Sequence, residues 1–166
     1  MPTAHQVVFR APREVALEPV EVAPPGPGQV LARATWSLIS TGTELTALSG
    51  DFPPDSGWAR YVRYPWVAGY SFVGVVEAVG EGVVTFRPGD RVGSFARHAT
   101  HATFPAARAW PISAGVTDEE AAFAVLAEIA FNGVRRGRVT FGESVAIVGA
   151  GLLGQLAAQI CRRAGA

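Results

Sequence analysis

The chain has 166 residues and is 49% hydrophobic, so it is long enough to bury a sizeable core and is expected to form about one ordinary domain. Fourteen basic residues balance 14 acidic ones, and the zero net charge gives no indication of nucleic acid or a membrane surface as a partner. Lysine is absent, which excludes a lysine Schiff base in this segment, and the single cysteine, Cys161, excludes an intrachain disulfide and a zinc site built from several cysteines.

The N-terminus lacks the basic and apolar pattern of a secretory signal. No apolar run approaches the ~18 residues that a membrane-spanning helix needs. We therefore expect a soluble cytoplasmic protein.

Short strand patterns separated by proline and glycine make up the first part of the chain. Residues 6–9 and 14–18 predict a hairpin, and the cluster PPGPG at 24–28 predicts a turn. The clearest strand is predicted over 30–38, where alternation places one face in the core. The residues expected on that face are Val30, Ala32, Ala34, Trp36 and Leu38.

This β region continues to about residue 112. A short helix is expected over 44–48, followed by a loop through 51–57, and the sequence RPGD at 87–90 predicts a tight turn. Many short strands joined by such turns indicate a small barrel or sandwich. The further strands expected are 71–79, 91–95, 101–104 and 109–112.

The pattern changes from strands to helices near Thr117. Thr117 and Glu120 have the spacing of a capping box, and residues 121–134 are apolar at helical spacing before an RRG stop signal. We therefore expect a β domain over 1–115 and the start of an α/β domain over 116–166.

The last stretch is predicted to form a buried strand, a glycine-rich turn and a helix. Apolar residues at 145–148 precede a G-x-G-x-x-G pattern, and amphipathic helical spacing continues to Ala164. The three glycines would permit a tight bend, close approach of a pyrophosphate and close helix packing. The alternative is an ordinary structural turn. The residues expected to bind a dinucleotide are Gly149, Ala150, Gly151, Leu152, Leu153 and Gly154.

Several short motifs follow one another in a specific order. They are PGPGQV at 25–30, ISTGTE at 39–44, Pro65, Gly69, GVV at 74–76, VG at 79–80, PGDRV at 88–92, GESV at 142–145 and VGAGLLG at 148–154. This order resembles the medium-chain dehydrogenase/reductase superfamily, the zinc-type alcohol dehydrogenase-like proteins. The resemblance implies a mainly β GroES-like barrel followed by the first β-α units of an α/β Rossmann domain. It also implies truncation within that domain, since such proteins usually have about twice this length.

The resemblance also bears on metal binding. Zinc-dependent members supply a thiolate from a Cys-Gly-Thr-Asp-like motif and an imidazole from a Gly-His-Glu motif. Here Thr41 stands at the thiolate position and Tyr70 at the imidazole position, and neutral hydroxyls are poor zinc ligands. A later family cysteine has no counterpart near Val125, and the four-cysteine lobe is missing. No zinc is therefore expected.

What remains is a hydride-transfer site without a Lewis acid. The resemblance implies proton relay for a hydroxyl at the position of Thr43, and Tyr70 is expected in the same cleft, where it could donate a proton or hydrogen bond to a carbonyl oxygen. Thr41, Thr43 and Tyr70 are the catalytic candidates. Alternatively, Tyr70 is buried at the barrel edge with its hydroxyl tied to backbone. Glu44 has a structural alternative as the carboxylate that opens the short helix.

Two further groups have both functional and structural explanations. His98 and His101 would diverge on a strand, so each is expected to be partly exposed or hydrogen-bonded rather than a metal ligand, although one could face the cleft. The aromatic segment 58–70, with Arg60 and Arg63, suits a lining for a flat or aromatic substrate with an acidic group. It equally suits a plug over the barrel end or a subunit contact.

These features predict an NAD(P)-dependent, zinc-independent oxidoreductase that moves hydride between nicotinamide and a carbonyl, alcohol or activated alkene. The residue that separates NAD from NADP would lie beyond Ala166. The stretch STGTE at 40–44 also resembles a subgroup that includes the bacteriochlorophyll-pathway hydroxyethyl dehydrogenase, so a large planar substrate is conceivable. A homodimer is one possible assembly. Little activity is expected from the 166 residues alone. The alternative function is a non-catalytic GroES-like module that binds a partner or senses nucleotide.

Overall fold

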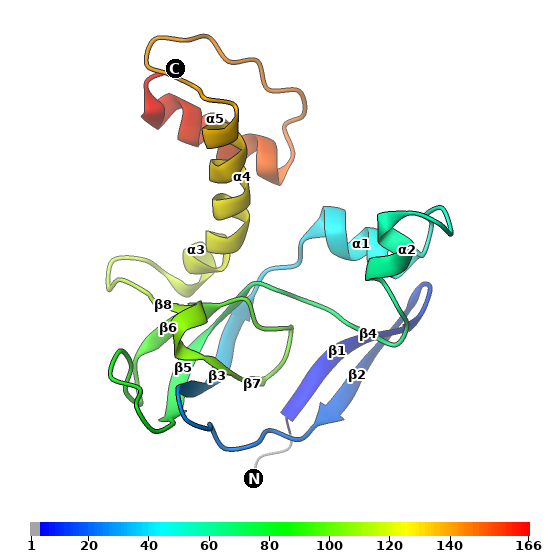
Figure 1. Ribbon diagram of the computed structural model, residues 1–166, viewed down its shortest axis with the longest axis vertical. Coiled ribbons are helices and arrows are strands. Elements are labelled where there is room, and N and C mark those ends of the chain that lie inside the picture. The colour runs from blue at the N-terminus through cyan, green and yellow to red at the C-terminus, as the bar shows by residue number, and fades with distance from the viewer. Residues whose placement is uncertain (1–3) are drawn as a thin grey trace. The chain divides into compact units, whose positions relative to one another are not determined.

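The computed structural model describes residues 4–166, which form two compact units that divide between Ala122 and Phe123 (Figure 1). The sequence-based boundary between residues 115 and 116 lies slightly earlier and remains a proposal for the domain division of the complete protein. Each unit has its own packing and is described by itself below.

Two antiparallel sheets build the first unit. The smaller sheet has the order β2-β1-β4, and the larger has the order β7-β3-β5-β6-β8. The strands are β1 (Ala4–Ala11), β2 (Glu14–Val20), β3 (Gln29–Ser37), β4 (Trp66–Val67), β5 (Phe72–Val79), β6 (Arg91–Ser94), β7 (His101–Pro105) and β8 (Ala109–Pro111), with the short helix η1 (Ala106–Arg108) before β8. The predicted opening hairpin is confirmed, because β1 and β2 pair in antiparallel register. A bridge between Gln6 and Ala99 connects β1 to the segment before β7.

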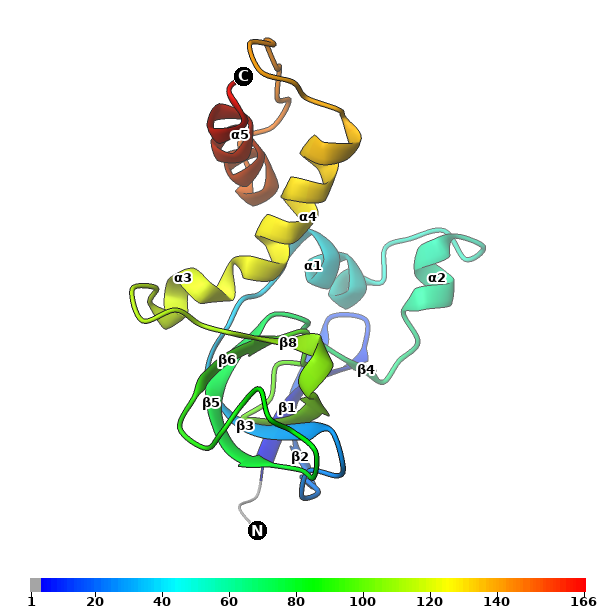
Figure 2. The same ribbon diagram turned by 60° about the vertical axis from the view of Figure 1, so that its left-hand side comes forward.

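The larger sheet curls around an apolar core (Figure 2). Val30 and Ala32 of β3 are completely buried in it, as the alternating pattern predicts. Each large apolar side chain buried in this way contributes about 1.5–3 kcal/mol. The buried members of the cluster are Val30, Ala32, Phe72, Val76, Phe86, Val92 and Phe104.

The end of β3 departs from the alternating pattern. The pattern predicts Trp36 in the core, but 48% of its surface is exposed, so this prediction is wrong. The pairing of β3 with β5 shifts register between Leu31 and Ala32 and again between Ala34 and Trp36. A register shift of this kind changes which side chains face the core. The alternation therefore fails at Trp36. Leu38, in contrast, is partly buried as predicted, against the cluster of Val73, Ala121 and Ala122.

Two short helices lie between β3 and β4 in the chain, α1 (Thr41–Ser49) and α2 (Gly57–Tyr61). Helix α1 is longer than the predicted segment 44–48. Helix α2 occupies a region where only a loop-like segment is predicted; its local signal is Ser56, whose Oγ accepts the Ala59 N–H as an N-cap. An aromatic cluster forms where these helices meet β1 and β4. Its buried members are Phe9, Ala47, Val62, Trp66 and Ala68.

The helix predicted over 121–134 is divided into two. Its parts are α3 (Asp118–Ala122) and α4 (Ala124–Arg136). The capping box is confirmed: the Glu120 N–H donates to Thr117 Oγ1 at 3.2 Å, and the Thr117 N–H donates to Glu120 Oε2 at 2.8 Å. The division is explained by Ser71, the residue directly before β5. Its Oγ donates to the Ala122 carbonyl at 2.5 Å. That carbonyl would otherwise accept an amide of a continuing helix.

The second unit consists of α4 packed against α5 (Leu152–Ala164). Helix α5 and the end of α4 at its RRG signal are predicted correctly. The strand predicted over 145–148 is wrong, since these residues form no strand and Val148 is fully exposed. A parallel strand forms only where neighbours complete its hydrogen bonds, and residues 123–166 contain no strand to do so. Within residues 4–166, no helix has the length and apolarity that crossing a membrane requires.

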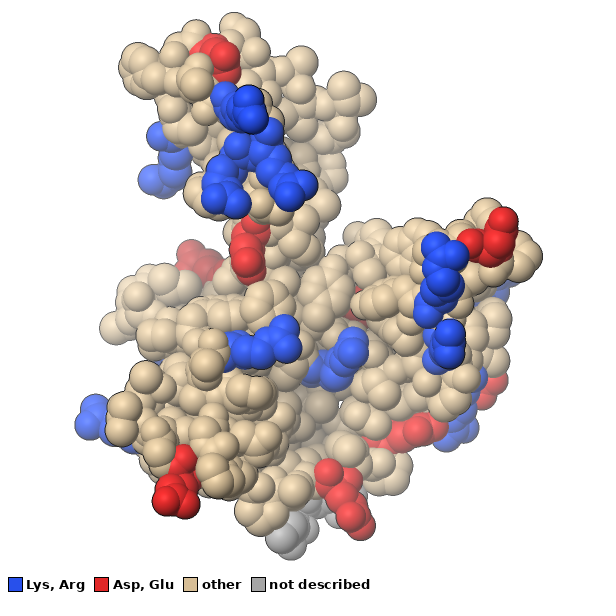
Figure 3. Space-filling model, in the orientation of Figure 1, with Lys and Arg blue, Asp and Glu red and all other residues tan. Residues whose placement is uncertain are grey.

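Basic side chains gather on the second unit, where Figure 3 shows a blue cluster. Arg135 and Arg136 lie in the last turn of α4, and Arg162 and Arg163 lie in the last turn of α5. Cations at a helix C-terminus interact favourably with the helix dipole. The cluster therefore has a local structural explanation.

Candidate active site

The start of α1 combines a candidate catalytic residue with a buried carboxylate. Glu44 is only 2% exposed although it lies in the first turn of the helix. Its Oε1 accepts the Ser40 N–H at 2.9 Å, and its own N–H donates to the Ser40 carbonyl at 2.8 Å. Glu44 thus opens the helix, as its position predicts, and fixes the backbone that carries Thr43.

The other oxygen of Glu44 binds a histidine from a distant part of the chain. His98 Nε2 lies 2.8 Å from Glu44 Oε2, and both side chains are buried. The His98 N–H donates to the Ala68 carbonyl and the His98 carbonyl accepts the Val7 N–H, both at 2.9 Å. The pair therefore ties α1 to β1 and to the segment after β4. His98 Nδ1 is buried and has no hydrogen-bond partner within the described residues.

Gly69, directly before Tyr70, makes room for this histidine. Its φ is +97°, and a Cβ at this position would lie 2.3 Å from the His98 backbone nitrogen. Only glycine tolerates both the left-handed backbone and this contact. Arg97 holds the same segment, because its Nη1 donates to the Gly69 carbonyl at 3.2 Å. The backbone leading into Tyr70 is thus fixed by two neighbours.

The structure brings Thr43 and Tyr70 together. The Tyr70 hydroxyl lies 3.5 Å from Thr43 Oγ1, a long hydrogen bond, and Tyr70 is half-buried. Thr41 is exposed at the first position of α1. The tyrosine whose hydroxyl is tied to backbone is Tyr64, which donates to the Ala47 carbonyl. Burial, together with the charge of Asp51, raises the pKa of Tyr64.

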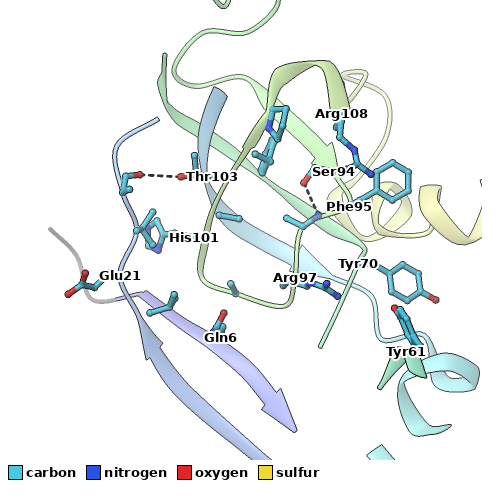
Figure 4. Close-up of a pocket in the computed structure, with 18 residues that line it drawn as sticks. Gln6, Glu21, Tyr61, Tyr70, Ser94, Phe95, Arg97, His101, Thr103 and Arg108 are labelled. Carbon is cyan, nitrogen blue, oxygen red and sulfur yellow. Dashed lines mark hydrogen bonds between the residues drawn. The ribbon is translucent and has the colours of Figure 1, made fainter. Parts of the chain in front are cut away.

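A pocket of about 600 Å³ lies beside Tyr70 (Figure 4). Tyr61 and Tyr70 lie together at one side of it, whereas His101 and Glu21 lie across from them. The other aromatic residues of segment 58–70 do not line the pocket; they pack in the cluster around Phe9. The aromatic segment thus acts mainly as packing, and only two of its described tyrosines, Tyr61 and Tyr70, line the pocket. Arg60 and Arg63 are not among the lining residues.

The histidines have side-chain neighbours, as the sequence suggests. His101 Nδ1 lies 3.2 Å from Thr100 Oγ1, and its Nε2 lies 3.6 Å from Glu77 Oε2. His98 is paired with Glu44. Within residues 4–166, no three side chains of His, Cys, Asp or Glu come together in a way that could hold a metal ion.

The glycine turn before α5 has a shape that fits a pyrophosphate. Gly149 has a φ of +105°, and a Cβ on Gly154 would lie 2.0 Å from the Gly149 carbonyl oxygen, so the helix packs closely on the turn. Gly151 is the N-cap of α5, and a Cβ there would meet no atom within 4 Å. The first-turn N–H groups of a helix have no intrahelical acceptor and favour an anion. Open space therefore adjoins these donors.

Comparisons with known proteins agree with these observations. The model of the alcohol dehydrogenase GroES-like domain matches residues 26–123. The 2-desacetyl-2-hydroxyethyl bacteriochlorophyllide A dehydrogenase of Cereibacter sphaeroides is 41% identical over 87 residues, which are 52% of this chain and 26% of that protein. Among the similar solved structures are two dehydrogenases. The 2R,3R-butanediol dehydrogenase from Bacillus subtilis gives a TM-score of 0.83 at 20% identity, covering 99% of this chain and 56% of that one.

The second solved structure is alcohol dehydrogenase TADH from Thermus sp. ATN1, with a TM-score of 0.78 at 27% identity. The match covers 98% of this chain and 56% of that one. The chain therefore spans about half the length of both solved structures, and its alignment covers about a quarter of the curated relative.

Proposed function

Since the chain belongs to the alcohol dehydrogenase GroES-like domain family, within the medium-chain dehydrogenase/reductase superfamily, we propose that it is part of an NAD(P)-dependent oxidoreductase. The proposed reaction transfers hydride between nicotinamide and a carbonyl, an alcohol or an activated alkene. We further propose that the protein is cytoplasmic, acts on a small-molecule substrate and binds no zinc. The 166 residues alone are expected to have little activity.

The glycine turn is the observation that carries this proposal. The bend at Gly149, the open space at Gly151 and the close helix packing at Gly154 support a pyrophosphate-binding turn. The exposed N–H groups at the start of α5 would hold the phosphates, together with the backbone of Ala150, Leu152 and Leu153. When bound, the nicotinamide would supply or accept the hydride.

The residues around Tyr70 suit proton transfer to the substrate. In the reduction of a carbonyl, the carbon gains a hydride and the oxygen gains a proton, which yields an alcohol. Tyr70 would donate that proton, and Thr43, 3.5 Å from the Tyr70 hydroxyl, would pass another proton to the tyrosine from solvent. Thr41 is the third proposed catalytic residue; it is exposed at the first position of α1 and would contact the substrate directly, because side chains two residues apart on a helix do not face each other. The donor set here is neutral hydroxyls, which is why the proposal omits zinc.

A change of Tyr70→Phe in the full-length protein tests the assignment. We expect turnover to fall by about ten-fold to a thousand-fold, the usual cost of losing one acid or oxyanion donor. The matched control is Tyr64→Phe, which removes a hydroxyl bound to the Ala47 carbonyl and is expected to affect stability only. Turnover would be measured with a panel of quinones, enones and aldehydes. Unchanged turnover in Tyr70→Phe would remove this residue from the mechanism.

Fluorescence titration with NADH and NADPH separates this proposal from a non-catalytic one. Binding followed by turnover supports the oxidoreductase. Tight binding without turnover on any panel member would instead favour a nucleotide-sensing module, to which the replacement of metal-ligand positions by Thr41 and Tyr70 is equally suited. Failure to bind either nucleotide would overturn the cofactor assignment.

A further inference from the structure

Two arginines at the pocket beside Tyr70 have no carboxylate partner. Arg97 and Arg108 both line the pocket, and neither forms an ion pair within residues 4–166. Most other arginines of the first unit do pair with carboxylates: Arg10, Arg13, Arg33, Arg87 and Arg91. The pocket thus retains unneutralised positive charge.

Arg97 is held in place for binding an anion. Its Nη1 donates to the Gly69 carbonyl, so the guanidinium is anchored next to Tyr70 while its other N–H groups stay available. A guanidinium fork matches a carboxylate in geometry and can bind it with two parallel hydrogen bonds. Because the anchor already restricts the side chain, less conformational entropy is lost when an anion binds.

Aromatic surface lies beside this charge. Tyr61 is 53% exposed and Phe95 is 40% exposed, and both line the pocket. Both rings are supported from behind: Tyr61 packs edge-on against Trp66, and Phe95 packs edge-on against Trp110. Figure 4 shows Arg108 reaching toward the Phe95 ring. These rings offer a rigid surface on which a planar ligand could stack.

Within residues 4–166, Glu21 is the one carboxylate that lines the pocket, and it lies across the pocket from this cluster. Figure 4 places Glu21 on the side opposite Tyr70 and Phe95. A negatively charged ligand would be attracted to the arginine side and repelled from the Glu21 side. The distribution of charge therefore favours one orientation of a bound anion.

We infer that this pocket binds a planar aromatic carboxylate, with the carboxylate on Arg97 and Arg108 and the ring against Tyr61 and Phe95. The pocket volume of about 600 Å³ lies within the usual range for small-molecule sites. The inference rests on the proposed function in one respect, since it makes such a carboxylate the substrate class. It replaces Arg60 and Arg63, the arginines that the sequence suggests for an acidic group.

Isothermal titration calorimetry with 2-naphthoate and its neutral analogue 2-naphthamide tests the inference without any cofactor. We expect naphthoate to bind at least ten-fold more tightly than naphthamide. Arg97→Gln and Arg108→Gln should each weaken naphthoate binding about ten-fold, the scale of a lost charge-assisted hydrogen bond, and leave naphthamide binding unchanged. Arg97→Gln could also disturb folding, because Arg97 bonds the Gly69 carbonyl. Arg108→Gln tests the charge without this complication, because Arg108 does not hold the Gly69 segment. Arg60→Gln is the control and should change neither affinity.

Equal affinity for the two probes, or equal losses for both in the arginine variants, would overturn the inference. The two proposals fail separately. Selective naphthoate binding without turnover of 4-formylbenzoate, or of any other panel member, leaves the pocket assignment intact and removes the oxidoreductase. Turnover of neutral aldehydes without naphthoate binding does the reverse.

Discussion

Glu44 and His98 show how a single buried pair can organise a candidate site. The Glu44 carboxylate accepts one hydrogen bond from the Ser40 N–H and bonds to the His98 ring, so it has two buried partners. These contacts fix the segments that carry Thr43 and Tyr70. Neither residue needs to touch a substrate in order to influence the proposed reaction.

The change Glu44→Ala should destabilise the protein by about 3 kcal/mol or more, because each buried polar partner left unsatisfied costs about 1–3 kcal/mol. Urea unfolding, monitored by tryptophan fluorescence, would measure this loss of stability. The control is Glu18→Ala, which removes an exposed ion pair with Arg10 and should cost less than about 1 kcal/mol. Similar losses in the two variants would contradict the central role of the buried pair.

The sequence identifies single residues of the candidate site better than their partners. Thr43 and Tyr70 stand at positions that a family motif marks, and the structure places their hydroxyls near one another. The pairing of Glu44 with His98 has no local signal, because 54 positions separate the two residues. Arg97 belongs to no motif, and only its fold position shows that it lines the pocket.

At the level of secondary-structure elements, Arg91 of β6 binds the start of α3 and the loop before it. Its Nε donates to Asp118 Oδ1 at 2.8 Å, and its Nη2 also bonds that oxygen and donates to the Val116 carbonyl at 2.7 Å. Asp118 is the first residue of α3, where the helix dipole favours a negative charge. The first turn of α3 is therefore fixed to the larger sheet.

This contact makes part of the stability dependent on pH. Burial opposes ionisation of Asp118, but hydrogen bonds from Thr35 and Arg91 and the charge of Arg91 outweigh it and lower the pKa of Asp118 below its ordinary value of 3.8. A carboxyl group whose pKa is lowered in the folded state stabilises the fold at pH values above its ordinary pKa. That contribution is lost as the pH falls through the folded-state pKa.

We expect Asp118→Asn to lower the free energy of unfolding by about 1 kcal/mol at pH 7, as for a partly exposed ion pair. The difference from wild type should shrink as the pH falls from 5 toward 2. Urea midpoints across this range would measure it, with the neighbouring Glu119→Gln as control. A difference that stays constant with pH would show that the charge of Asp118 has no role.

Elements with local signals could be predicted, and those that depend on distant partners could not. The opening hairpin, β5 and the capping box at Thr117 have turn and cap residues that act within a few positions. The stretch 145–148 has the composition of a strand but lacks neighbouring strands within the described residues. Ser71 divides the predicted helix through one long-range hydrogen bond, which no helical pattern reveals.

At the scale of the molecule, the predicted fold class is confirmed, because the order of motifs carries family information that single elements lack. The two units also differ in how much they bury. The unit ending at Ala122 has three buried apolar clusters. The unit from Phe123 to Ala166 leaves large apolar residues exposed, among them Phe131, Phe141 and Val148.

The second unit should therefore unfold at a lower urea concentration than the first. All four tryptophans lie before Phe123, so tryptophan fluorescence reports on the first unit, whereas Cys161 is buried in the second. We expect the Cys161 thiol to react with a disulfide reagent at urea concentrations where tryptophan fluorescence is still native, since so short a segment buries little surface. Coincident transitions for the two signals would contradict this expectation.

The contact between Gly69 and His98 also defines how the pocket could be engineered. Any side chain at position 69 would collide with the His98 backbone, and any smaller residue at position 98 would leave one oxygen of the buried Glu44 carboxylate without its partner. Gly69 and His98 do not line the pocket, but they hold the backbone next to Tyr70 and Arg97, which do, so they should stay fixed while lining residues are varied. A library that randomises the lining residues Tyr61, Phe95 and Arg108 while preserving Gly69 and His98 should retain far more folded variants than one that also randomises these two positions.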